Sequence, residues 1–363
     1  MKKKVLLVIL FILISFALFS FAFWRVSDML CYAEGWNTFY YNEHYIMDSI
    51  RSGMMTSLIE GFFLQFFHKP LHGIILMSLL FVALEAILLV SFRRIKVKLL
   101  GYVIPFAITT FLVICTASSL SKSSFLTVLG LGGANETATM VYEQLSCKER
   151  DMDWDGILEL EASRMPEANL LNQNILNMAM AEKGMLHEHL YDNPCGDINS
   201  IYVNDVQSEY VAALLSDIYY SMGHMAQAQR YAFEANEKMD NKSPRLLQRL
   251  IKTNIIYGQY GVARKYLRKL SDAIYYEEWC EHYGKLLDDA SVKADKELGE
   301  KRLCLNIKNK FSGFNGLDKD LLMVARATKG HKQSQTTVQY LSALYRLAGY
   351  KEEYQSLLKE FKL

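Results

Sequence analysis

The chain has 363 residues, of which 51% are hydrophobic and 22% charged, and its 40 Lys and Arg against 39 Asp and Glu leave a net charge of +1. After residue 120 the count is 30 basic against 33 acidic residues, with no basic stripe, so nucleic acid is excluded as an expected partner. Proline occurs only five times, and no sustained apolar–polar alternation is present. These features predict an all-α fold.

Three apolar stretches predict membrane-spanning helices over about residues 5–24, 71–92 and 99–120. No Ala-x-Ala-like cleavage site follows the first stretch, which favours an uncleaved anchor over a signal peptide. The second contains one charge, Glu85, which the surrounding Leu, Ile, Val and Phe residues outweigh. We therefore expect a membrane domain over residues 1–120, a linker over 121–133 and a separate domain over 134–363.

Basic residues near the span ends predict the orientation in the membrane. Lys2, Lys3 and Lys4 precede the first span, and four more cations lie within residues 93–98. By the positive-inside rule both groups face the cytoplasm. The outer loop 25–70 and the C-terminal domain are then expected outside the cytoplasm, with the N-terminus inside.

The outer loop 25–70 contains its own helical pattern. Apolar residues recur at helical spacing from Ile46 to Phe67, with polar residues on the other face. This predicts one or two amphipathic helices at the membrane–water interface, with bends at Gly53 and Gly61.

The second half of the chain contains two similar segments at a spacing of 35 residues. "GHMAQAQRYAFEA" starts at Gly223, and "GQYGVARKYLRKL" starts at Gly258. Each carries Ala five residues on, at Ala228 and Ala263, and Tyr eight residues on. A helical hairpin of this length repeats because one hairpin cannot bury its own apolar face. We expect Gly in the turn of each hairpin and Ala where the two helices approach closely.

Weaker copies are centred on Gly184 and Gly349, the latter as a terminal capping repeat. Ser243 and Pro244 predict the N-cap and first turn of one repeat helix. The polar stretch 285–335 predicts an irregular helix pair, with "FSGFNGLDKD" as a loop and Asp318 capping a helix from Leu321.

This pattern of Gly, Ala and aromatic residues resembles degenerate tetratricopeptide repeats. "NLLNQNILNMAMAEKGML" and "SPRLLQRLIKTNIIYGQYGVARKYLRKL" also resemble an uncharacterised family of bacterial membrane proteins, as does the loop "YYNEHYIMDSIRSGMMTSLIEGFFLQFFHKPLHG". The resemblance implies multiple membrane helices followed by a tetratricopeptide-like α-solenoid, without an established activity. Many members of that family have more than three spans.

Candidate chemistry is sparse. His187 and His189 resemble a metal motif, but residues two apart on a helix face different directions, so we expect no shared metal. Glu278 and His282, four apart, are expected to be a surface pair. Glu85 needs a partner or a wet cavity; it could line an ion or substrate path, but contact with water or with Arg93 and Arg94 is the preferred interpretation.

Glu43 is the one weak catalytic candidate, because it lies in the outer loop beside His44, where an acid could bind a metal or act as a general base. No cofactor and no metal site is expected. None of the six cysteines forms a CxxC pair; disulfides among Cys147, Cys195, Cys280 and Cys304 are the alternative to free buried thiols.

The sequence therefore predicts a non-enzymatic protein of a bacterial inner membrane. Its membrane helices lie in the lipid bilayer and anchor a periplasmic helical-repeat domain, whose concave face would hold a protein or peptide partner. The alternative is a membrane enzyme or transport component that acts on lipid-linked glycans at the outer face of that membrane.

Overall fold

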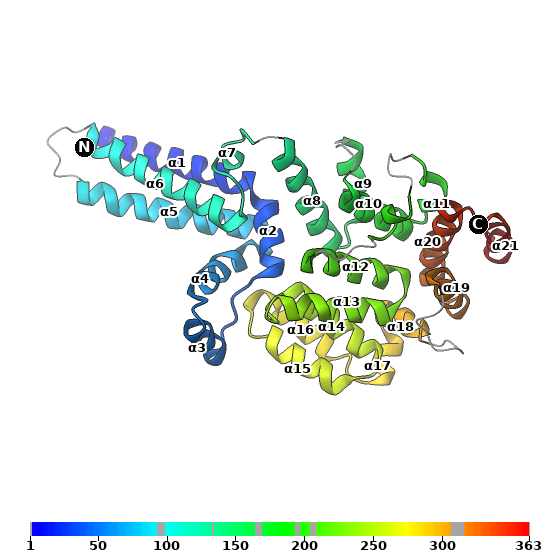
Figure 1. The fold of residues 1–363 in the computed structure, drawn as a ribbon. Helices are drawn as coiled ribbons and strands as arrows, with labels where there is room; N and C mark the ends of the chain where they lie inside the picture. The colour runs from blue at the N-terminus through cyan, green and yellow to red at the C-terminus, as the bar shows by residue number, and fades with distance from the viewer. Residues whose placement is uncertain are drawn as a thin grey trace. The chain divides into compact units, whose positions relative to one another are not determined.

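The computed structural model describes residues 2–92, 99–132, 134–163, 169–192, 197–203, 208–305 and 316–362. Every regular element in these ranges is a helix (Figure 1). The chain divides into two compact units. Unit 1 comprises residues 1–39 and 43–144, and unit 2 comprises Tyr40–Asn42 and Leu145–Leu363. Part of the expected 121–133 linker forms the short helix α7 (Phe125–Val128), which lies within unit 1.

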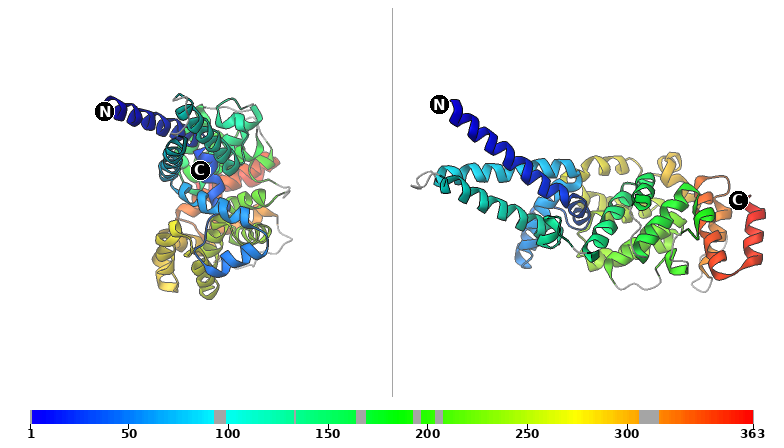
Figure 2. Two further views of the ribbon diagram at one scale, coloured as in Figure 1. Left: turned by 90° about the vertical axis from the view of Figure 1, so that its left-hand side faces the viewer. Right: turned by 90° about the horizontal axis from the view of Figure 1, so that it is seen from above.

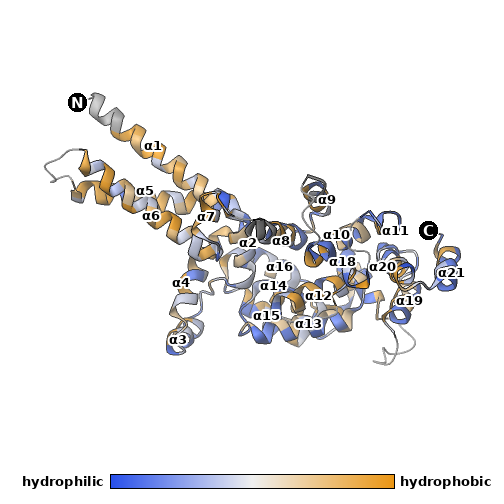
Figure 3. Cartoon of the chain, turned by 45° about the horizontal axis from the view of Figure 1, so that its top comes forward, coloured by the Kyte–Doolittle hydropathy of each residue, from blue (hydrophilic) through white to orange (hydrophobic). Residues whose placement is uncertain are grey.

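Three long helices of unit 1 are apolar enough to cross a membrane. They are α1 (Lys2–Arg25), α5 (Pro70–Phe92) and α6 (Leu100–Ser121), and their candidate spans cover Val8–Arg25, Pro70–Phe92 and Leu100–Ser121. Each of the three packs against the other two. Figure 3 shows the described parts of these helices as mostly hydrophobic. The three predicted spans are therefore present as helices of spanning length and composition.

The outer loop is more helical than expected. It contains α2 (Ser27–Trp36), α3 (Glu43–Arg51), α4 (Met55–Leu64) and the 3-10 turn η1 (Gln65–His68). Gly53 has φ +74° between α3 and α4, so the predicted bend is confirmed there. Gly61 lies inside α4 instead. A Cβ atom at Gly61 would lie 3.0 Å from the backbone oxygen of Thr38, so a close approach explains this glycine and a bend does not.

Unit 2 is built mainly from helical hairpins. They pair α12 (Glu209–Met222) with α13 (Met225–Lys238), α14 (Pro244–Ile256) with α15 (Tyr260–Leu270), and α20 (Lys332–Ala348) with α21 (Lys351–Phe361). Figure 2 shows α20 and α21 side by side at the C-terminal end of the unit. The other helices are α8 (Ala134–Arg150, shared with unit 1), α9 (Trp154–Ser163), α10 (Leu170–Lys183), α11 (Leu186–His189), α16 (Glu277–Gly284), α17 (Asp289–Ala294), α18 (Lys296–Leu303) and α19 (Leu317–Ala327), with 3-10 turns η2 (Ile198–Ser200) and η3 (Ile274–Tyr276).

The predicted turn glycines have the conformation that the hairpins require. Gly184, Gly223, Gly258 and Gly349 all have φ between +72° and +86°, a left-handed conformation that only glycine adopts without strain. Ala228 is fully buried, and its carbonyl accepts a 2.7 Å hydrogen bond from the Ser216 hydroxyl across the α12–α13 pair. The predicted position of glycine in the turns and of alanine at a close helix contact is therefore confirmed.

Two helix starts test the sequence rules. Ser243 caps α14 as expected, accepting a hydrogen bond from the Leu246 amide, with Pro244 in the first turn. The prediction for Asp318 was wrong: α19 begins at Leu317 after Gly316, and Asp318 lies in its first turn. An acidic side chain there still interacts favourably with the positive end of the helix, which is why the sequence resembled a cap. Residues 306–315, which include the first half of the predicted loop 311–320, lie outside the described residues, and residues 317–320 of that loop belong to α19 instead.

Candidate functional site

Unit 2 differs from an open repeat array in one respect. The first helices of the hairpins, α10, α12 and α14, carry buried polar residues. Later helices cover them: α18 packs on α14, and α20 packs on α10 and α12. These three helices therefore pack against the protein's own C-terminal helices.

Polar side chains of α20 form hydrogen bonds with the last residues of α12. Tyr340 of α20 is fully buried and hydrogen-bonds to Ser221 of α12, while Gln333 donates to the Ser221 carbonyl. Thr337 donates to the Met222 carbonyl at 2.9 Å. These bonds satisfy the last carbonyl groups of α12, which would otherwise be buried without partners. They explain why α20 carries so many short polar side chains on its inner face.

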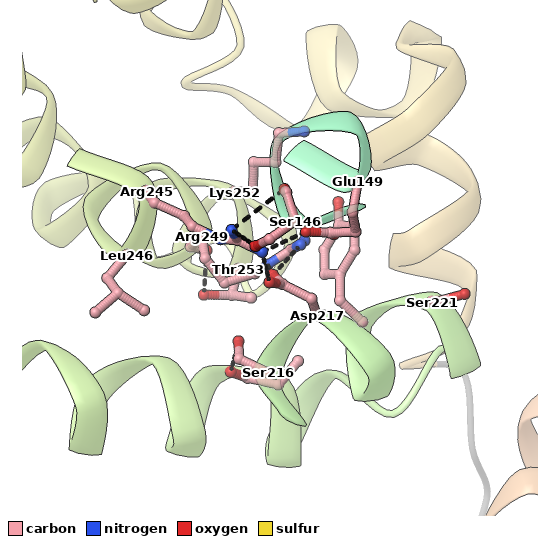
Figure 4. Close-up of polar contacts among 12 residues, drawn as sticks. Ser146, Glu149, Ser216, Asp217, Ser221, Arg245, Leu246, Arg249, Lys252 and Thr253 are labelled. Atoms are coloured by element: carbon pink, nitrogen blue, oxygen red, sulfur yellow. Dashed lines mark hydrogen bonds and ion pairs between the residues drawn. The ribbon is translucent and has the colours of Figure 1, made fainter. Parts of the chain in front are cut away.

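The strongest feature of the interior is an ionic cluster of Glu149, Asp217, Arg245 and Arg249 (Figure 4). Asp217 of α12 accepts from Arg245 at 2.6 Å and from Arg249 at 2.7 Å. Arg245 also binds Glu149 of α8 and, at 2.7 Å, the Ser146 hydroxyl. The four charged side chains are between 6% and 15% exposed, so the cluster is largely removed from solvent.

Two acids in this cluster respond differently to the same burial. Burial raises the pKa of Glu149 to about 7, helped by the charge of Asp217 and opposed by Arg245. Burial acts in the same direction on Asp217, but Arg245 and Arg249 outweigh it and hold the pKa of that carboxyl below its usual range. Asp217 is thus the permanent counter-charge of the two arginines, while Glu149 is the group that can gain a proton near neutrality.

A second ionic group continues along the same face. Glu297 of α18 binds the Lys252 amine at 2.8 Å and accepts hydrogen bonds from Tyr220 and Tyr283. Burial would raise its pKa, but the Lys252 charge and these bonds lower the pKa to about 2. The guanidinium of Arg249 lies 3.7 Å from the centre of the Tyr220 ring, which joins this group to the first.

The two ionic groups hold helices together. Their carboxylates are engaged by cations, and burial raises the pKa of Tyr220 and Tyr283, so these tyrosines keep their protons at neutral pH. The acids and bases of the two groups come from α8, α12, α14 and α18, so the two groups together join four helices. They fix how these helices pack.

The cluster was missed by sequence reasoning. Arg245, Arg249 and Lys252 are spaced four and three residues apart and therefore share one helix face, which is a signal that was available. Their partners Asp217 and Glu149 lie 28 and 96 residues from Arg245, and no local pattern connects them. Only the packing of α8, α12 and α14 brings these charges together.

The histidines singled out in the sequence bind different groups. His187 contacts the Ser342 hydroxyl at 2.7 Å and stacks on Tyr354, whereas the exposed His189 pairs with Asp192. Burial, with the Arg346 charge, lowers the pKa of His187. Glu278 and His282 are both exposed on α16. Within the ranges that the structure describes, no group of three or more His, Cys, Asp or Glu is placed to hold a metal ion.

Glu43 is the first residue of α3, and its side chain is exposed, as is that of His44. An acid at the start of a helix interacts favourably with the positive end of the helix dipole, so the position of Glu43 has a structural explanation of its own.

A different acid in unit 1, Glu143, has a raised pKa. Burial and, to a smaller extent, the charge of Asp28 together raise the pKa of Glu143 to about 8. Glu143 is 8% exposed, and the Gln144 amide beside it donates to Asp28 at 2.6 Å.

The cysteines of unit 2 are unlinked where the structure describes them. Cys147, Cys280 and Cys304 are buried and form no disulfide, and Cys195 lies outside the described residues. Burial raises the pKa of Cys280 to about 12 and that of Cys304 to about 11. Since the thiolate is the reactive form, both are expected to be inert in the folded protein.

Comparison with known proteins gives a family and no activity. No curated protein and no solved structure matches the chain. One family model matches residues 1–134 and 122–349, and it therefore covers both the membrane helices and the helical unit. The chain belongs to this family, a family of unknown function designated DUF6057.

Proposed function

We propose that the protein is a non-enzymatic, membrane-anchored scaffold that binds a protein or peptide partner through unit 2. The observation that carries the proposal is the combination, in one chain, of three helices of spanning length and a unit of helical hairpins with glycine turns. Stacked hairpins of this kind serve as binding surfaces in many unrelated proteins. The ionic cluster stiffens that surface.

The partner surface is inferred to be the outer face of α13 and α15, because α18 and α20 cover the inner face. Phe233 of α13 is 50% exposed and Val262 of α15 is 41% exposed. Arg264, Lys265 and Arg268 are exposed on α15, and no ion pair holds any of them in the described part of the chain. Exposed apolar side chains beside free cations favour a partner segment that is acidic and amphipathic.

We place the protein in a bacterial inner membrane, with its N-terminus in the cytoplasm and unit 2 in the periplasm. The basic residues at the start of α1 and within 93–98 support this orientation. A second observation agrees with the number of spans. Tyr40 donates to the Lys242 carbonyl at 2.7 Å, and Asn42 donates to Asp272 at 2.9 Å. In the chain, two crossings, α5 and α6, lie between Tyr40–Asn42 and the rest of unit 2, and an even number of crossings leaves both parts of unit 2 on one side of the membrane.

The experiment is site-specific photo-crosslinking of the full-length chain in cells. A crosslinking residue at Val262 is expected to capture a protein, and the charge reversal Arg264→Glu/Lys265→Glu/Arg268→Glu is expected to abolish the capture. The matched control Lys285→Glu/Lys351→Glu/Lys359→Glu reverses three exposed charges on α16–α17 and α21 and is expected to leave it unchanged. Equal loss in both triple variants, or capture that survives the α15 reversal, contradicts the proposed surface.

A second candidate function is a membrane enzyme or transport component acting on lipid-linked glycans. The observation that favours it is Glu143, a buried acid with a pKa of about 8 beside Asp28 in unit 1, since an acid that keeps its proton at neutral pH can act as a general acid. Glu143→Gln or Glu43→Gln would then abolish the cellular phenotype of the protein while crosslinking from Val262 persists. The scaffold proposal expects the reverse: both variants retain the phenotype, and the α15 reversal loses it.

A further inference from the structure

Glu85 has an unusual environment in unit 1. It lies in α5, 15 residues after Pro70 and 7 before Phe92, so it is about 10 Å from the nearer helix end at 1.5 Å per residue. Its side chain is 0% exposed even without a surrounding membrane. Neither carboxylate oxygen makes a hydrogen bond to a described residue. The helix therefore carries a fully buried acid that has no acceptor or donor holding it in place.

The residues facing Glu85 form a polar seam between antiparallel helices. Ser15 of α1 interacts with the Glu85 carboxyl, yet its buried hydroxyl also lacks a hydrogen bond of acceptable geometry. Two turns along, Ser20 of α1 donates to Ser78 of α5 at 3.0 Å. Ser78 and Glu85 are seven residues apart and share a helix face. In this seam the Ser20–Ser78 pair is hydrogen-bonded, whereas the buried oxygens of Ser15 and Glu85 have no hydrogen bond of acceptable geometry.

No described basic side chain of α1, α5 or α6 is placed beside Glu85 to balance its charge. Among the side chains that the structure describes in α1, α5 and α6, the other titratable ones are Arg25, His72, Tyr102 and Cys115. Arg25 is ten residues, or about 15 Å, along α1 from Ser15. One turn beyond Ser15 in the other direction, Phe11 packs against Tyr102 and Phe106. Helix α2 and η1, with Asp28, Glu34 and His68, contact α5 toward its beginning, where Phe67 meets Gly73.

We propose that Glu85, with Ser15, is a proton-binding site inside the membrane unit. A buried carboxylate without a cation is strongly disfavoured in hydrocarbon, and one acid beside hydroxyl groups offers too few ligands for a divalent metal. A proton removes the charge and supplies the donor that the Ser15 oxygen lacks. Loss of the proton leaves an unpaired charge between α1 and α5, so the packing of these two helices is linked to occupancy of the site.

The test uses the full-length chain in phospholipid nanodiscs and infrared spectroscopy. At pH 7 the difference spectrum of wild type minus Glu85→Gln is expected to contain the C=O stretch of a protonated carboxylic acid, because the contributions of Glu143 and Glu149 cancel in the difference. The band should shift when the buffer is changed to D2O, because a binding site exchanges its proton with solvent. Glu143→Gln is the matched control, since it removes another buried acid but leaves the Glu85 band in place.

A second measurement does not depend on any variant folding. A hydrophobic carbodiimide adds to a protonated carboxyl in hydrocarbon and leaves an acylurea adduct, with all atoms of both retained. Mass spectrometry is expected to find the adduct on Glu85 in the wild type and none on Glu43, which faces water. The proposal is overturned if Glu85 takes no adduct, or if its band never shifts in D2O. It is also overturned if the band is absent from the wild type and appears in Arg93→Gln/Arg94→Gln, which would identify a carboxylate paired with the loop arginines.

Discussion

Replacing Asp217 by Asn tests the cohesive role of the ionic cluster. Asn keeps the shape of the side chain but removes the charge that two arginines share, at 2.6 Å from Arg245 and 2.7 Å from Arg249. Removing one partner of a buried ion pair costs about 3 to 5 kcal/mol of unfolding free energy. We expect the lower end, about 3 kcal/mol. Burial is the main cause of the raised pKa of Glu149, and the Asp217 charge adds to it; without that charge the pKa falls, so Glu149 ionises more and replaces part of the lost charge.

Hydrogen exchange of the full-length chain in nanodiscs measures this cost. Amides in the middle of α12 and α14 exchange only when unit 2 opens, so about 3 kcal/mol corresponds to a loss of roughly a hundredfold in protection. The matched control is Glu234→Gln in the exposed pair that Glu234 forms with Arg230, where the side chains are 41% and 58% exposed. There we expect about 0.3 to 0.5 kcal/mol, or roughly a twofold change.

The compensation by Glu149 gives a second, independent check. The double variant Asp217→Asn/Glu149→Gln has no acid left to balance Arg245, so its cost is expected to exceed the sum of the two single variants. The reasoning is refuted if Asp217→Asn costs no more than Glu234→Gln. It is also refuted if the double variant is simply additive, because Glu149 would then not respond to Asp217.

Further predictions concern pH, turns, caps and thiols. The pKa of Glu149, raised from 4.5 to about 7 by burial, means that the folded state holds a proton that the unfolded state releases. The contribution of this proton to the free energy of unfolding is complete below pH 4.5 and is lost as the pH rises through 7. Exchange protection of unit 2 should therefore fall between pH 5 and 8, and Glu149→Gln should weaken this dependence of protection on pH. Gly223→Ala should destabilise unit 2 more than Gly184→Ala, as measured by thermal melting. Both have positive φ, but only at Gly223 does the new Cβ meet other side chains, the nearest atom 2.8 Å away. Ser243→Ala should cost about 1 kcal/mol, read from exchange in the first turn of α14, whereas equal protection in the variant would show that the cap contributes nothing. Cys304, with a pKa of about 11, should resist maleimide in the folded chain and react on denaturation, and rapid labelling of the native protein would contradict its burial.

Local sequence features determined much of this protein. Apolar length alone specified α1, α5 and α6, because a helix that satisfies its own backbone needs only enough apolar residues to cross the bilayer. The repeat glycines and the Ser243 cap were likewise readable, since each acts on backbone groups within a few residues. The Gly61 and Asp318 predictions failed because a close approach and a first-turn acid produce the same local signal as a bend and a cap.

Tertiary structure alone decided the polar interior and the environment of Glu85. Asp217, Arg245 and Glu149 come from three helices, and their pairing depends on how those helices pack rather than on any spacing in the chain. The same is true of the packing of α18 on α14 and of α20 on α10 and α12, which the repeat pattern did not predict. Charge and burial act through space, so the pKa values of Glu149 and Glu143 could not be inferred until their neighbours were known.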